Sequence, residues 1–240
     1  MSPEPTLNSK QSQLADRLAS VQQRIAAACS RVGRSPDDIT LVGVSKTWPL
    51  ADLQAAVAAG VTELGENYVQ EAVDKVQQWQ GPAPVWHFIG PLQSNKTRLV
   101  AEHFDWVQSI DRLKIAQRLA EQRPEQLPPL NVCIQINISQ DPAKAGIATT
   151  ELLSFADQIS ALPRLRLGGI MAITAADLSD TELRRQFDEL KSLSDTLIQQ
   201  HPAASVLSMG MSADFETAIE CGATHVRVGS ALFGQRNYAS

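Results

Sequence analysis

Strand-like and helix-like patterns alternate eight times along this 240-residue chain, and this alternation limits its fold more than any other feature. The strand-like runs are short and rich in Val, Ile and Leu, as in parallel strands that are buried on both faces. Successive strand–helix units are spaced roughly 25 to 30 residues apart, as in repeated β/α units. The strand-like runs cover residues 39–47, 63–65, 85–90, 105–110, 130–137, 165–173, 206–209 and 225–229.

This alternation predicts the α/β class and a closed (β/α)8 TIM barrel. An open doubly wound sheet would also alternate, because strand order cannot be read from periodicity. Closure is favoured because the helices are of similar size and no glycine-rich dinucleotide motif follows the first strand. Apolar residues recurring at three- and four-residue intervals from Leu14 to Val32 predict an extra N-terminal helix. No linker divides the chain, so we expect one domain over residues 1–240.

Composition excludes several classes of function. A hydrophobic fraction of 43% and a charged fraction of 20% are typical of globular proteins, and no run approaches the ~18 apolar residues of a membrane span. The first residues carry neither a basic nor an apolar segment, so we expect no signal peptide and a cytoplasmic location. A net charge of -5 without a long basic run argues against nucleic acid. Three widely separated cysteines argue for reduced thiols.

Lys46 ends the first strand-like run, directly before the turn signal Trp48-Pro49. In α/β folds ligands bind at the carboxyl ends of the strands, which makes this position a candidate for chemistry. A lone lysine at a strand end more often marks only the point where the strand meets water, because lysine is rarely buried. Its function therefore depends on the residues that surround it.

The loops after the seventh and eighth strands are candidates for a phosphate site. Gly210 and Gly229 would allow backbone N–H groups to approach a phosphate, and Ser212 and Ser230 could add hydroxyl donors. Barrels often bind phosphate at this place. In the alternative interpretation, the serines cap helices and the glycines serve turns. The acidic Asp214 suits the following helix dipole without a ligand.

Arg227 interrupts an otherwise apolar strand, and a buried guanidinium is costly unless it is paired. A charge there indicates a partner inside the mouth of the barrel. Lys46 could form a Schiff base, Arg227 could meet a ring nitrogen, and the loops could hold a phosphate. Together these three features describe pyridoxal 5'-phosphate (PLP).

At this point the chain resembles the pyridoxal phosphate homeostasis protein family, the single-domain relatives of the alanine racemase barrel. Segments such as His-Phe-Ile-Gly and Ser-Met-Gly-Met-Ser are unlikely to recur together by chance. The matching segments run through most of the chain, at residues 44–47, 63–68, 86–96, 169–171, 207–215 and 226–234.

The resemblance implies a barrel of the alanine-racemase N-terminal type, in which Lys46 carries PLP as a Schiff base. It also implies that Arg227 faces the pyridine nitrogen and that nearby amides help the serines hold the phosphate. Asn67 would orient Lys46 or the cofactor, and Met171 could pack against the ring, although a strand methionine is more often core. His87 is more often a satisfied core histidine. The cofactor-binding residues expected are Lys46, Asn67, Met171, Ser208, Gly210, Ser212, Arg227, Gly229 and Ser230.

The function implied is PLP homeostasis: a monomer that holds the cofactor, keeps free aldehyde low and passes the cofactor to PLP-dependent apoenzymes, without efficient catalysis.

An amino-acid racemase is the main alternative. An arginine at the pyridine nitrogen disfavours it, because an unprotonated ring is a weak electron sink. A two-base racemase also needs a second proton carrier, and neither Tyr68 nor Tyr238 is an obvious one. Racemases of this fold take that tyrosine from a partner's C-terminal domain, which we expect this chain to lack. A Schiff-base aldolase acting on a sugar phosphate would leave Arg227 without a clear role.

Overall fold

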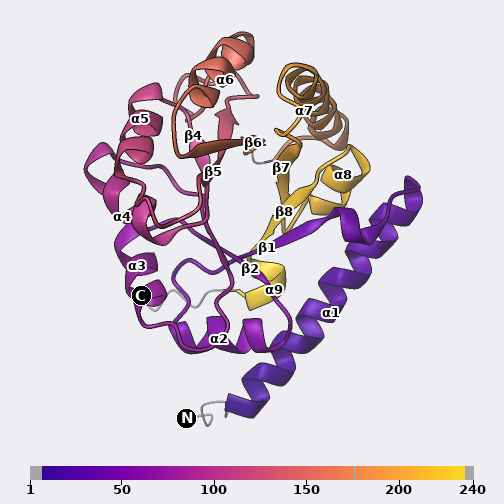
Figure 1. Ribbon diagram of the computed structural model, residues 1–240. Coiled ribbons are helices and arrows are strands. Elements are labelled where there is room, and N and C mark those ends of the chain that lie inside the picture. Colours follow the sequence, from indigo (N-terminus) through magenta and orange to yellow (C-terminus); the bar gives the residue numbers. More distant parts are fainter. Residues whose placement is uncertain (1–6, 176, 236–240) are drawn as a thin grey trace.

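The computed structural model describes residues 7–175 and 177–235, and its eight parallel strands close into a barrel (Figure 1). Each strand pairs with the next in chain order, and β8 pairs back onto β1 with Thr40 opposite His225. This closure confirms the predicted TIM barrel and rules out the open sheet. The strands are β1 (Thr40–Val44), β2 (Glu63–Glu66), β3 (Val85–Phe88), β4 (Trp106–Ile110), β5 (Leu130–Ile136), β6 (Leu165–Ala172), β7 (Val206–Met211) and β8 (His225–Val228).

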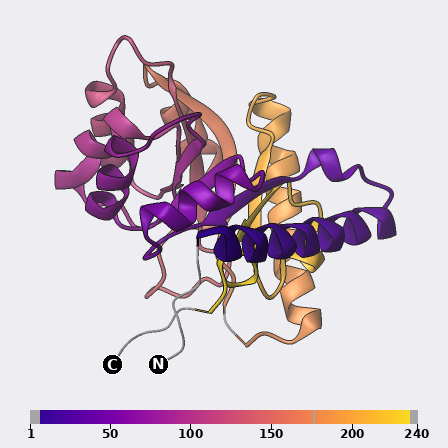
Figure 2. The same ribbon diagram turned by 90° about the horizontal axis from the view of Figure 1, so that it is seen from below.

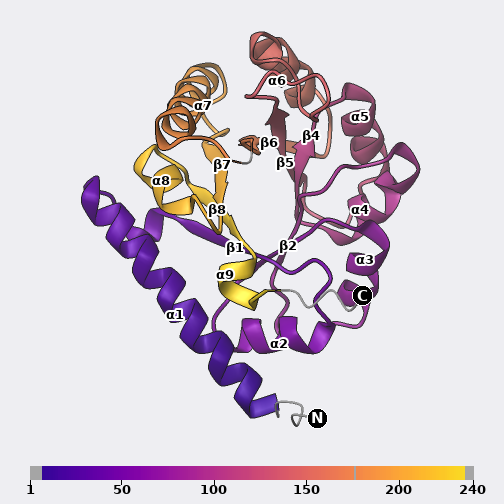
Figure 3. The same ribbon diagram turned by 180° about the vertical axis from the view of Figure 1, so that it is seen from behind.

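Helices surround the barrel, as expected for β/α units whose strands are buried on both faces (Figure 3). The last of them is a single turn that follows β8 directly. They are α1 (Leu7–Arg31), α2 (Leu50–Ala58), α3 (Val69–Gln77), α4 (Thr97–His103), α5 (Leu113–Gln122), α6 (Leu152–Ser160), α7 (Asp180–Gln200), α8 (Phe215–Glu220) and α9 (Ser230–Phe233). None of the helices in the described ranges is both long and apolar enough to cross a membrane.

Helix α1 is the predicted additional N-terminal helix, and it extends along one side of the barrel (Figure 2). Leu14, Leu18, Val21 and Ile25 lie on its buried face, which confirms the amphipathic pattern. The helix packs against α2, α8 and α9. It therefore covers the part of the barrel wall where the first and last strands meet.

Strands β6 and β7 approach each other closely at Gly169. This residue has φ +153°, and a Cβ there would overlap the carbonyl oxygen of Val206. Only glycine fits such a contact, which explains Gly169; at the preceding Gly168 a Cβ would come within 2.5 Å of the Trp106 ring. Because all eight strands are parallel, their carboxyl ends lie at one mouth of the barrel, where residues distant in sequence come together.

Candidate functional site

A cavity of about 600 Å³ lies at the carboxyl ends of the strands. Six of the nine predicted cofactor-binding residues line it, and they come from the ends of β1, β2, β7 and β8. This position is where TIM barrels place their sites, and the volume is that of a small-molecule pocket. The six residues are Lys46, Asn67, Ser212, Arg227, Gly229 and Ser230.

Lys46 lies in the turn between β1 and α2, with its neighbour Ser45 completely buried. Lys46 is partly exposed and lines the cavity, so its amine can be reached from solvent. Thr47 follows with φ 68°, a left-handed conformation that is unusual for a β-branched residue. This strained step turns the chain sharply just after Lys46.

Arg227 extends from β8 into the barrel and is only 4% exposed. Its Nη1 donates to Ser208 Oγ at 2.7 Å and its Nη2 donates to the carbonyl oxygen of Ala172 at 2.8 Å. Burial lowers the pKa of Arg227 to about 10, so the guanidinium remains cationic at neutral pH. The site therefore contains a fixed positive charge. In the described part of the chain, no carboxylate lies within hydrogen-bond distance of it.

A line of buried polar side chains continues from Arg227 through the barrel interior. Ser208 Oγ donates to Gln108 Oε1 at 2.6 Å, and Gln108 Nε2 lies 2.9 Å from His87 Nδ1. His87 Nε2 in turn lies 2.6 Å from Glu63 Oε2. A neutral imidazole with its proton on Nε2 satisfies both contacts. His87 is thus the satisfied core histidine that was predicted, and the line of side chains fixes the Arg227 guanidinium from below.

The loop after β7 meets the start of α9 through Ser212. Its Oγ accepts hydrogen bonds from the backbone N–H groups of Gly229 at 3.1 Å and Ala231 at 3.3 Å. The nearby Asp214 carboxylate accepts from the N–H of Met211 at 2.6 Å. Asp214 is therefore engaged at the start of α8. These amides are occupied within the protein, whereas the hydroxyls of Ser212 and Ser230, which both line the cavity, are donors that suit a phosphate.

Three of the predicted residues do not line the cavity. Met171 and Ser208 have no exposed surface, and Ser208 reaches the site only through Arg227. Gly210 has φ +89° and lies against α8, where a Cβ would come within 2.5 Å of the Ala218 Cβ. Direct contact between these three residues and a cofactor stays a prediction.

The sequence analysis missed an apolar rim on the same cavity. Ile89, Ile173 and Met211 line it, and Ile173 and Met211 are 42% and 40% exposed. Their place at the ends of predicted strands was the available signal, because barrels build their sites at the carboxyl ends of the strands. Of the two tyrosines, Tyr68 is 55% exposed and Tyr238 lies outside the described residues.

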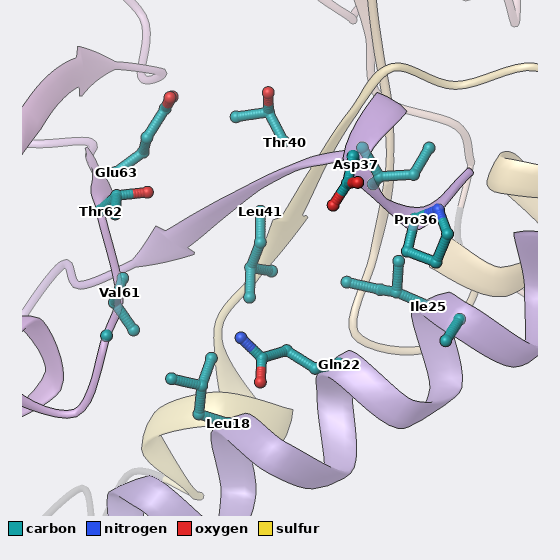
Figure 4. A pocket seen from close by; sticks show the side chains of 13 residues that line it. Leu18, Gln22, Ile25, Pro36, Asp37, Thr40, Leu41, Val61, Thr62 and Glu63 are labelled. Atoms are coloured by element: carbon teal, nitrogen blue, oxygen red, sulfur yellow. The ribbon is translucent and has the colours of Figure 1, made fainter.

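A second cavity, of about 500 Å³, lies at the opposite end of the barrel, between α1 and the starts of β1 and β2 (Figure 4). Leu18 and Gln22 of α1 form one side, and Thr40 and Glu63 belong to the strands. None of the nine predicted residues lines it. The cavity at the carboxyl ends is therefore the candidate site, in agreement with the general rule for barrels.

Comparisons with known proteins show the family to which the chain belongs. The family described as "Alanine racemase, N-terminal domain" matches residues 17–237. The pyridoxal phosphate homeostasis protein of Escherichia coli K12 is 51% identical over 232 residues, which cover 94% of this chain and 98% of that protein. The chain belongs to the pyridoxal phosphate homeostasis protein family. This membership confirms the resemblance predicted from the motifs.

Solved structures of other proteins share the fold of this chain. PipY of Synechococcus elongatus PCC7942, solved with PLP bound, is 36% identical and has a TM-score of 0.80. The match covers 92% of this chain and all of PipY. Alanine racemase from Corynebacterium glutamicum is 16% identical with a TM-score of 0.69, over 94% of this chain and 63% of the racemase. At that identity the likeness to the racemase concerns the fold alone.

The side chains that line this cavity are of the kinds that PLP requires. Lys46 would supply a primary amine for the aldehyde, and Arg227 would supply a cation for the ring nitrogen. The Ser212 hydroxyl, whose oxygen accepts from the Gly229 N–H, would donate its own proton to the phosphate. Asn67 adds a buried Oδ1 that has no hydrogen-bond partner in the described part of the chain. A buried acceptor without a donor is costly, so this atom is consistent with a ligand that donates to it.

Proposed function

We propose that this protein binds PLP as a Schiff base on Lys46, holds it in reserve and passes it to PLP-dependent apoenzymes without efficient turnover of its own. When bound, PLP supplies an aldehyde that condenses reversibly with primary amines. The observation that carries the proposal is the convergence of Lys46, Arg227 and Ser212 on one cavity. The naming of its relatives and the PLP-bound PipY structure support the same choice of cofactor.

Each residue has a distinct task in this proposal. Lys46 provides the amine and remains accessible to a competing amine from solvent, which allows release. Arg227 donates to the neutral Ser208 hydroxyl and the Ala172 carbonyl oxygen, so its charge would face the ring nitrogen and keep that atom unprotonated. Ser212, whose Oγ already accepts from the amide groups of Gly229 and Ala231, would donate its own hydroxyl proton to the phosphate.

The absence of efficient turnover is proposed from the chemistry of the cavity. Apart from Lys46 and Arg227, the described residues that line it carry no titratable side chain. A two-base racemase needs a second proton carrier within hydrogen-bond reach of the substrate. The apolar rim of Ile89, Ile173 and Met211 offers none.

Spectral titration with PLP tests this function. We expect saturable binding with an absorption band of lysine-bound PLP in the wild type, and loss of that band in Lys46→Ala. Lys96→Ala is the matched control. Lys96 lines a separate cavity beside Tyr68 and Gln93 and does not line the cavity of Lys46. Retention of the band in Lys46→Ala would contradict the assignment of the lysine.

Loading assays then separate a carrier from an enzyme. A carrier is expected to reactivate a PLP-dependent apoenzyme and to leave a panel of amino acids unchanged. Steady racemisation of any amino acid at a useful rate, abolished by Lys46→Ala, would instead establish the enzyme.

A further inference from the structure

The turn that carries Lys46 rests on a buried charged network. Lys75 Nζ, from α3, lies 2.8 Å from Glu66 Oε1 and 3.2 Å from the carbonyl oxygen of Ser45. The Ser45 hydroxyl donates to the same Glu66 oxygen at 2.7 Å. Ser45 and Glu66 have no exposed surface, and Lys75 is 7% exposed. The residue before Lys46 is thus held by both its hydroxyl and its carbonyl group.

The residue after Lys46 is held by the same network. Glu71 Oε1 accepts from the backbone N–H of Thr47 at 2.6 Å and also lies 2.6 Å from Lys75 Nζ. Thr47 has φ 68°, and a β-branched residue adopts this conformation only when its surroundings enforce it. The contact with Glu71 supplies that enforcement. One lysine on α3 therefore connects the hydrogen bonds on both sides of Lys46.

We propose that Glu71 and Lys75 are positioning residues that fix the backbone of Lys46 so that its amine meets PLP. The inference rests on the proposed function, because it assigns a role in presenting Lys46. Neither side chain lines the cavity, so both would act through the turn formed by Ser45 and Thr47. A flexible lysine needs a fixed origin, because covalent chemistry is sensitive to small displacements of the reacting atom.

The burial of Lys75 and its contacts with two carboxylates distinguish this network from an ordinary ion pair on a helix surface. Glu71 and Lys75 are four residues apart on α3, a spacing common to exposed helix pairs. Here Lys75 is buried, and it contacts a second carboxylate from the end of β2. Burial raises the pKa of Glu66, whose Oε2 has no partner in the described part of the chain. A buried ion pair is weak evidence for stability, so the contacts of this network with the turn around Lys46 are the observation that carries the positioning role.

The test compares Glu71→Ala with Asp74→Ala in the full chain. Both residues are acidic and lie on α3, but Asp74 accepts from Gln70 on the exposed side of the helix, whereas Glu71 accepts from the Thr47 N–H. Glu71→Ala is expected to slow formation of the lysine-bound band about tenfold or more after addition of PLP. Asp74→Ala is expected to behave as wild type. Glu71→Gln keeps an acceptor for the Thr47 N–H and should lose less than Glu71→Ala.

Thr47→Gly provides a readout that a general loss of stability would not give. Glycine adopts positive φ without strain, so the turn no longer depends on the contact with Glu71. The double variant Glu71→Ala/Thr47→Gly is therefore expected to form the band faster than Glu71→Ala alone. Simple addition of the two single effects would overturn the proposal, as would a wild-type rate in a folded Glu71→Ala protein.

Hydrogen exchange at the Thr47 amide, measured without PLP, separates this proposal from the proposed function. Glu71→Ala should increase exchange at that amide specifically, whereas Asp74→Ala should not. If the wild type never loads PLP on Lys46 but the Thr47 amide is protected as expected, the proposed function is rejected. The role of Glu71 in fixing the turn is then still supported. If PLP loads normally and the amide is unaffected by Glu71→Ala, only the positioning role fails.

Discussion

Two buried polar networks meet at the candidate site, and they hold different parts of it. Beneath Lys46, the network of Glu66, Lys75 and Glu71 is charged and holds the backbone. Beneath Arg227, the line of Ser208, Gln108 and His87 is largely neutral and holds the side chain itself. The difference suits the two tasks. Lys46 must bind and release the cofactor, so its side chain stays mobile while its backbone is fixed. Arg227 must face the ring, so its side chain is itself fixed.

The charged network should be the more sensitive of the two to loss of one member. Lys75→Met leaves the buried Glu66 carboxylate without its cation. We expect the free energy of unfolding to fall by about 3–5 kcal/mol, measured by urea denaturation. The double variant Lys75→Met/Glu66→Gln should recover much of this loss, because the only carboxylate that then lacks Lys75 is Glu71, which is partly exposed to water. A loss below about 1 kcal/mol would mean that solvent reaches Glu66 and the pair is not truly buried.

The barrel interior should respond to pH. Burial lowers the pKa of His225 to about 4, with the neighbouring His87 and Arg227 adding to the effect and Glu63 opposing it. The unfolded chain therefore binds the histidine proton more readily between pH 6.5 and 4. In this window the free energy of unfolding should fall as pH falls, by about 3 kcal/mol from this group.

His225→Gln should remove this part of the acid sensitivity. Urea denaturation of both proteins at several pH values between 7 and 4 measures the difference, in which the contributions of carboxylates cancel. Parallel curves for the two proteins would contradict a neutral, partly buried His225.

Ser208→Ala tests the link between Arg227 and the rest of the interior line. The change removes the acceptor of the Arg227 Nη1 and the donor to Gln108, so the free energy of unfolding should fall by about 2 kcal/mol. Ser192→Ala is the matched control, since its hydroxyl bonds only a helix carbonyl on the surface of α7. Equal effects of the two substitutions would show that the interior line does not fix Arg227.

The smallest effect is expected at the strained turn, and it has the opposite sign. Thr47→Gly relieves the positive φ of a β-branched residue, so the free energy of unfolding should rise by about 1 kcal/mol. Thermal or urea unfolding measures this change. A loss of stability would show that the threonine side chain contributes more than its backbone strain costs.

The fold was predictable because each strand and helix carries its own local pattern. The eight apolar runs all appear as strands, and Leu18 and Val21 lie buried on the predicted N-terminal helix. Lys46 and Arg227 were predictable as chemical candidates because each interrupts or ends an apolar run. Their convergence on one cavity follows from barrel closure, which brings the ends of β1 and β8 together.

The rest of the site depends on contacts between elements that no local pattern specifies. Lys75 falls four residues after Glu71 and resembles half of an exposed helix pair, yet its amine reaches back to Ser45. Glu66, a carboxylate at the end of an apolar strand, was a comparable signal to Arg227. Ser208 stands in a matching motif, but alternation along β7 places it inside the barrel, below the cavity.

The most direct test of the central claim is to reduce the PLP-loaded protein with borohydride and locate the pyridoxyl group by peptide mass. We predict a single modified peptide that contains Lys46, with loss of the visible band on reduction. Modification at another lysine, or no stable adduct after PLP is added, would contradict the assignment of Lys46 and of the cavity around it.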